Sequence, residues 1–98
     1  MKDTAHTFTH EKHGVTFSVA VNGQAPFYRF VITASYEGVH LYTLHHLHRF
    51  EWSSDGRHTL EHTARHEFNA YVIDNAYLSA VKTAHRLKHE AEQRAYMH

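Results

Sequence analysis

Cysteine is absent from this sequence, and neither sign of charge is in excess. Without cysteine, disulfide bonds, thiolate catalysis and cysteine-ligated metal sites are excluded. Lys and Arg together number 10, and Asp and Glu together number 10, so no basic excess attracts nucleic acid or an anionic membrane at neutral pH. A nucleic-acid partner is therefore not expected. A net charge near zero also favours self-association.

Long apolar runs are lacking as well. The first residues, Met1 to His6, do not form the apolar core of a signal peptide, and no later run approaches the length of a transmembrane helix. We therefore expect a cytoplasmic protein without a membrane partner. Its 98 residues, of which 42% are hydrophobic, suit one globular domain over residues 1–98.

Histidine, by contrast, is abundant, with 13 copies. Histidine is the side chain that ordinarily changes charge between about pH 5 and pH 8. Protonation of all 13 raises the formal net charge from 0 to +13. The sequence therefore predicts that the behaviour of the protein near pH 5.5 differs from its behaviour near pH 7.5.

The segment 59–95 contains neither proline nor glycine and is rich in strong helix formers. Its apolar residues recur at spacings of three and four, which is typical of one face of an amphipathic helix. This pattern predicts a helix over about residues 58–96, with a start signal in Ser53–Gly56 or at Thr59. The apolar stripe consists of Phe68, Val72, Ala76, Ala80, Ala84, Leu87, Ala91 and Ala95.

The predicted helix is too long for the body that it covers. A continuous helix of this length spans roughly 55 Å, whereas a compact domain of this size has a radius of gyration of about 13 Å. Either the helix breaks near Asp74-Asn75, or its C-terminal half reaches a second subunit. The small residues Ala76, Ala80 and Ala84 allow another helix to approach closely as a homodimer seam. The alternative is that these alanines lie close over the chain's own sheet.

Residues 4–50 alternate between apolar and polar side chains, as half-buried strands do. Turns centred on Lys12-His13, Asn22-Gly23 and Glu37-Gly38 divide them into four strands and give mutually consistent registers. We therefore predict an α+β fold, ββββα, in which a four-stranded antiparallel meander sheet has one long C-terminal helix packed on one face. The predicted covered face consists of Phe8, Val15, Phe17, Val19, Tyr28, Phe30, Ile32, Ala34, Tyr36, Val39, Leu41 and Leu47.

The opposite face of the predicted sheet is more apolar than a solvated face needs to be. Such a patch often marks an interface, although scattered exposed apolar residues are also normal. With the third turn at Glu37-Gly38, His45 points inward near Phe30. The predicted contacts for a protein partner on the open face are Phe27, Arg29, Tyr42, Leu44, His46 and His48.

Three histidines of the predicted helix, His58, His62 and His66, are spaced four apart and stack on one face. Imidazole pairs at this spacing can hold zinc or nickel. The zinc-protease helix motif is absent, because Thr63 rather than glutamate follows His62. The chain is so rich in histidine that this spacing also arises by coincidence. A histidine-based metal-binding or pH-responsive protein is therefore an alternative function.

Catalytic signatures are missing from the sequence. There is no nucleophile elbow and no glycine-rich phosphate loop, and the histidines do not match the pairs of two-histidine phosphodiesterases. The sequence favours a non-enzymatic homodimer that binds another protein, with a small histidine-dependent hydrolase or nuclease as a further alternative. In its organisation, although in no motif, the chain resembles small regulators and phage-encoded inhibitors such as anti-CRISPR proteins.

Overall fold

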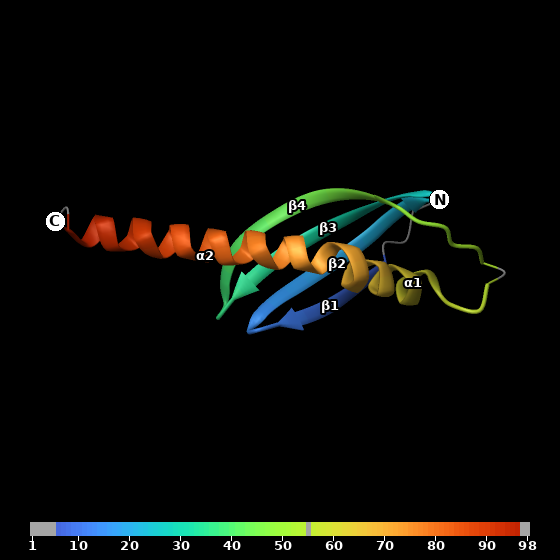
Figure 1. Cartoon of the computed structure of the whole chain (residues 1–98), viewed down its shortest axis with the longest axis horizontal. Coiled ribbons are helices and arrows are strands. Elements are labelled where there is room, and N and C mark those ends of the chain that lie inside the picture. The colour runs from blue at the N-terminus through green and yellow to red at the C-terminus, as the bar shows by residue number, and fades with distance from the viewer. Residues whose placement is uncertain (1–5, 55, 97–98) are drawn as a thin grey trace.

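The computed structural model describes residues 6–54 and 56–96, which form one antiparallel sheet followed by one long helix (Figure 1). The strands lie in sequence order, β1-β2-β3-β4, so the predicted α+β meander with a C-terminal helix is confirmed. The predicted start of the first strand at Thr4 lies outside the described residues. The strands are β1 (His6–Lys12), β2 (Val15–Gln24), β3 (Phe27–Tyr36) and β4 (Val39–Arg49).

The helix is continuous and does not break at Asp74-Asn75, so that alternative is wrong. It comprises α1 (Leu60–Glu67), a single π-helical turn η1 (Phe68–Val72) and α2 (Ile73–Tyr96). Thr59 is the N-cap, because its hydroxyl accepts a 3.0 Å hydrogen bond from the backbone N–H of His62. The π turn places Phe68 and Val72 against the sheet, where both are buried.

The helix runs past the end of the sheet, as Figure 1 shows. The molecule measures 61 × 28 × 20 Å, and its radius of gyration of 16.2 Å exceeds the roughly 13 Å of a compact domain. Every residue from Lys88 to Tyr96 is exposed. None of the described helices is long and apolar enough to cross a membrane.

Two of the three predicted strand registers are shifted by an even number of residues. Asn22 and Gly23 do not form a turn but pair with Arg29 and Tyr28, and the chain reverses at Ala25-Pro26 instead. In the first hairpin Phe8 pairs with Val19 rather than with Phe17. Even shifts leave each side chain on its predicted face, so the core of β1, β2 and β3 is as expected except at Tyr36, which is 39% exposed.

A bulge in β4 changes the third register by a single residue. Ser35 pairs with His40 and Ala34 pairs with Tyr42, so Leu41 is the extra residue between them. A shift of one residue turns every later side chain of β4 to the opposite face. His45 therefore points outward, and Leu47 is 72% exposed, so both predicted inward positions are wrong.

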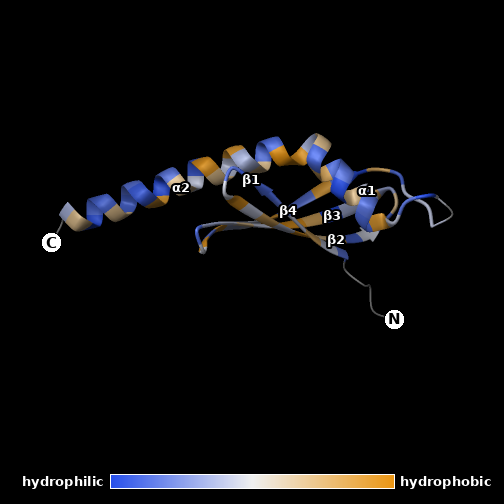
Figure 2. Ribbon diagram, turned by 90° about the horizontal axis from the view of Figure 1, so that it is seen from below, coloured by the Kyte–Doolittle hydropathy of each residue, from blue (hydrophilic) through white to orange (hydrophobic). Residues whose placement is uncertain are grey.

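The core lies between the helix and the sheet, with Phe68 at its centre. The centroid of the Phe68 ring lies 5.8 Å from that of Phe8, 6.1 Å from that of Phe17 and 6.4 Å from that of Phe30. Figure 2 shows the helix along one face of the sheet, with no described segment on the other face. That uncovered face and the overhanging part of α2 are two surfaces that the fold leaves accessible to other molecules.

Candidate functional site

The six predicted contact residues do not share a face. Phe27 and Arg29 lie on the uncovered face of the sheet, where both are exposed. The other four, Tyr42, Leu44, His46 and His48, follow the bulge at Leu41 and lie under the helix, where they are half-buried. The prediction of one common face is therefore wrong, because a single inserted residue in β4 reverses these four side chains.

The uncovered face carries an apolar and basic patch at the β3–β4 edge. Cross-strand pairs set Phe27 opposite Arg49 and Arg29 opposite Leu47. The Arg49 guanidinium lies 5.6 Å from the centroid of the Phe27 ring, which is a cation–π contact. His45 is exposed on the same face. We call Phe27, Arg29, His45, Leu47 and Arg49 the outer patch.

Small hydroxyl residues fill most of the remaining uncovered face. The hydroxyl oxygens of Thr33 and Thr43 lie 3.3 Å apart across β3 and β4. Within the four described strands Glu11, in the edge strand β1, is the one carboxylate. The strands therefore give the outer patch two arginines and no carboxylate, and the nearest acid in sequence is the exposed Glu51, two residues after Arg49. The hydroxyl residues are Thr7, Thr9, Thr16, Ser18, Thr33, Ser35 and Thr43.

The inward residues of β4 attach the helix to the sheet. The Tyr42 hydroxyl donates a 2.7 Å hydrogen bond to the backbone carbonyl of Ala76, and its burial raises the pKa of Tyr42 to about 12. His48 Nε2 lies 3.0 Å from Glu67 Oε1, and both side chains are largely buried. These contacts occupy Tyr42 and His48 within the chain, so they are structural rather than partner contacts.

His46 and His48 are the nearest approach to a catalytic group. Their ring centroids lie 5.9 Å apart, and the pKa of His46 is lowered by burial and, to a smaller extent, by His48. A carboxylate such as Glu67 orients an imidazole as general bases require. However, the cavity beside His46 measures about 140 Å³, below the roughly 300 Å³ at which ligand pockets begin. This arrangement does not favour the hydrolase or nuclease alternative.

The three predicted metal ligands are not gathered into a metal site. The rings of His58 and His62 stack at 4.4 Å between centroids, and His66 lies exposed one turn further on. Among residues 6–54 and 56–96, no three His, Cys, Asp or Glu side chains are placed to hold a metal ion. The predicted zinc or nickel site at these histidines is therefore not supported by the geometry.

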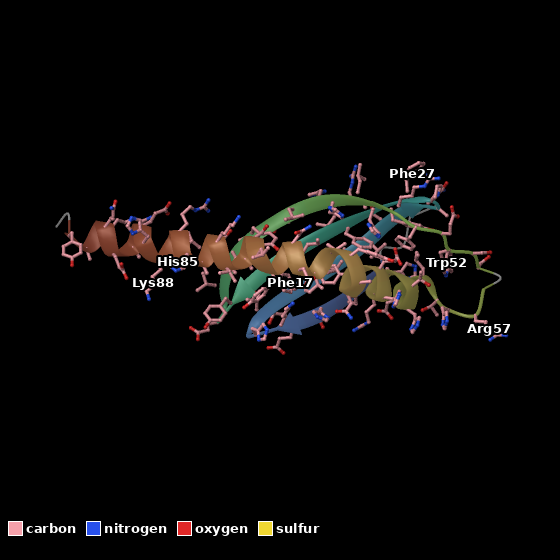
Figure 3. All side chains as sticks on the ribbon, in the orientation of Figure 1. Phe17, Phe27, Trp52, Arg57, His85 and Lys88 are labelled. Carbon is pink, nitrogen blue, oxygen red and sulfur yellow. The ribbon has the colours of Figure 1, made fainter. Side chains whose placement is uncertain are left out.

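A larger apolar cavity, of about 530 Å³, lies where α2 leaves the sheet. We call it the exit groove. Figure 3 labels His85 and Lys88, which line it from the helix side. The sequence pattern did not predict this groove, because its lining comes from three segments that are far apart in the chain, 13–15, 36–41 and 77–88. The groove is lined by His13, Val15, Tyr36, Glu37, Val39, Leu41, Tyr77, Ala80, Val81, Ala84, His85, Leu87 and Lys88.

The predicted alanine seam is divided between the chain's own core and the exit groove. Ala76 is 4% exposed and Ala80 is fully buried, because both pack on the sheet. The close approach permitted by these alanines is therefore used within the chain, and they are wrong as a surface seam. Ala84 is half-buried and lines the groove.

Comparison of the chain with protein-family models, with curated proteins and with solved structures finds no match. Any role for the outer patch or the exit groove therefore has to be argued from the residues that form them.

Proposed function

We propose that the protein is a non-enzymatic regulator or inhibitor whose outer patch docks onto an acidic, partly apolar surface of another protein. One observation supports this proposal most directly. Phe27 and Leu47, which are 65% and 72% exposed, lie between two arginines on a sheet face that no described segment covers. Figure 3 labels Phe27 at the edge of the molecule, with its side chain directed away from the sheet.

The chemistry of the outer patch suits a protein interface. Aromatic and arginine side chains supply much of the binding energy at such interfaces, and buried charged groups need partners. Arg29 and Arg49 therefore require carboxylates on the partner, while Phe27 and Leu47 require an apolar contact. The surrounding threonine and serine hydroxyls can form hydrogen bonds at the rim.

Nucleic acid fits this patch less well than an acidic protein does. Affinity for a phosphate backbone grows with the number of cationic contacts, and the patch offers two arginines on a chain with no net charge. It also offers a single aromatic ring for base stacking. An acidic protein surface needs only a few complementary pairs around an apolar centre.

Site-directed photo-crosslinking in cells tests the proposal. A photoreactive phenylalanine analogue replaces Leu47 in one variant and Leu78, an exposed leucine of α2, in the matched control. We expect one protein to cross-link from position 47 but not from position 78. We further expect R29E combined with R49E to abolish that product, and acid-to-lysine changes in the identified protein to restore it.

Two outcomes contradict the proposal. One is equal cross-linking from positions 47 and 78. The other is a position 47 product that nuclease treatment removes, which assigns the patch to nucleic acid.

A further inference from the structure

We propose that the exit groove receives the end of α2 from a second copy of the chain, so that two α2 helices cross antiparallel and form a two-fold dimer. The groove and the overhanging helix end lie at the same end of the molecule (Figure 1). In a two-fold dimer each copy therefore gives its helix end and receives that of its partner. This inference is independent of the outer patch.

The overhanging part of α2 carries apolar side chains that are left exposed within the described part of the chain. Leu87 lies at the groove, and Ala91 and Ala95 continue its stripe at spacings of four. Both alanines are exposed, and Tyr96, the last residue of α2, is 89% exposed. A helical end of this length is marginally stable in water without tertiary contacts. A partner that covers the stripe stabilises it.

The exit groove offers the complementary apolar surface. Val39 is 56% exposed, while Tyr36 and Val81 are each 39% exposed. Val81, His85 and Lys88 line the groove from one flank of α2, and Tyr96 projects from that same flank by helical periodicity. In an antiparallel pair of helices, each flank of one helix faces the same flank of its partner. The partner's Tyr96 is therefore directed toward the groove.

The charges at the helix end fit an antiparallel crossing centred near Ala91. This register sets Lys88 within one turn of the partner's Glu92 on the groove flank. On the other flank it sets Glu90 within one turn of the partner's Arg94. A parallel pair in register instead sets helix end beside helix end, so neither end reaches the exit groove of the partner. Opposite charges at facing flanks set orientation in helix pairs.

The exposed area of the chain is sufficient for such an interface. The chain exposes 7282 Å², whereas a compact monomer of 11.5 kDa exposes roughly 5,800 Å². The excess of roughly 1,500 Å² is larger than the roughly 800 Å² that each partner contributes to a standard interface. The absence of net charge leaves no overall repulsion between two copies.

Sedimentation equilibrium of the purified full chain at tens of micromolar tests the dimer. We expect twice the chain mass of 11.5 kDa for the unsubstituted protein. A91E places a carboxylate at the crossing and should give a monomer with an unchanged circular dichroism spectrum. Q93E is the matched control, since it adds the same charge on the opposite side of the helix and should remain dimeric. Y96S should raise the dimer dissociation constant about tenfold.

A charge exchange tests the antiparallel register separately from the dimer itself. K88E alone should weaken the dimer, and K88E combined with E92K should restore it. A monomeric unsubstituted protein, or a dimer that survives A91E, overturns the proposal. A dimer that survives A91E but is abolished by F27S combined with L47S assigns the contact to the outer patch, and this also overturns it. Failure of the double charge exchange to restore the dimer overturns the antiparallel register.

Discussion

The two halves of the C-terminal helix, residues 60–80 and 81–96, carry one continuous apolar stripe but lie in different surroundings. In the first half Phe68, Ala76 and Ala80 are buried against the sheet. In the second half Ala91 and Ala95 occupy equivalent positions of the stripe and are exposed. The strands end beneath the boundary between the halves. An apolar stripe therefore shows that a helix face needs cover, but not whether the chain's own sheet or another molecule provides it.

The largest expected contrast comes from making the same substitution in both halves. A64L adds a bulky side chain where the helix is fully buried against the sheet and should lower the free energy of unfolding by about 1–3 kcal/mol. A91L adds the same side chain on the exposed stripe and, at chain concentrations below the dimer dissociation constant, should leave the unfolding of the sheet domain unchanged. Urea unfolding followed by tryptophan fluorescence measures both. Equal destabilisation of the two variants contradicts the division into a packed half and an overhanging half.

A smaller contrast involves tyrosine hydroxyls. Y42F removes the hydrogen bond to the Ala76 carbonyl and should cost about 0.5–1.5 kcal/mol, whereas Y96F in the second half should cost nothing measurable. Because the folded pKa of Tyr42 is raised to about 12, the unfolded chain releases this proton first. Stability from Tyr42 is therefore complete below about pH 10 and is lost as the pH rises toward 12.

Urea midpoints between pH 8 and pH 11 measure this dependence. Y42F should flatten the loss of stability at high pH, and Y96F should not. An identical alkaline loss in Y42F and in the unsubstituted protein contradicts the assignment to Tyr42.

The smallest expected contrast is in how stability depends on acidic pH. It compares His46, which lies in β4 beneath the first half of the helix, with His89 in the exposed second half. Burial lowers the folded pKa of His46, so the unfolded chain binds this proton more readily. The contribution of His46 to stability is therefore lost as the pH falls below about 6.5, which is the ordinary pKa of histidine in an unfolded chain. H46Q should reduce the difference between urea midpoints at pH 7.5 and pH 5.5. H89Q, in the exposed half, is the control, and an equal reduction there contradicts the role of His46.

The sequence patterns predicted the layers of the fold because those layers depend on periodicity alone. The strand alternation assigned Phe17 and Phe30 to the core, and it did so even though the Asn22-Gly23 turn was placed wrongly. A register error of an even number of residues moves strands along each other without exchanging their faces. This is why the core could be predicted while the pairing could not.

The candidate site was harder to predict, because one inserted residue determines which side chains of β4 lie on the uncovered face. Leu41 is inserted opposite Ala34 and Ser35, and this bulge reverses His46 and His48 as well as Leu47. Nothing in the local pattern around Leu41 signals an extra residue, because Leu41 and Tyr42 are both apolar. Of the five residues of the outer patch, the prediction contained Phe27 and Arg29, and the structure adds His45, Leu47 and Arg49.

Amide hydrogen exchange at several protein concentrations examines the two halves of the helix in one experiment. We expect amides in the first half to be protected at every concentration, because the chain's own sheet covers them. Amides between residues 85 and 96 should be protected at tens of micromolar and exchange rapidly after dilution below the dimer dissociation constant. Rapid exchange of that segment at every concentration, or protection that does not change on dilution, contradicts cover by a second copy.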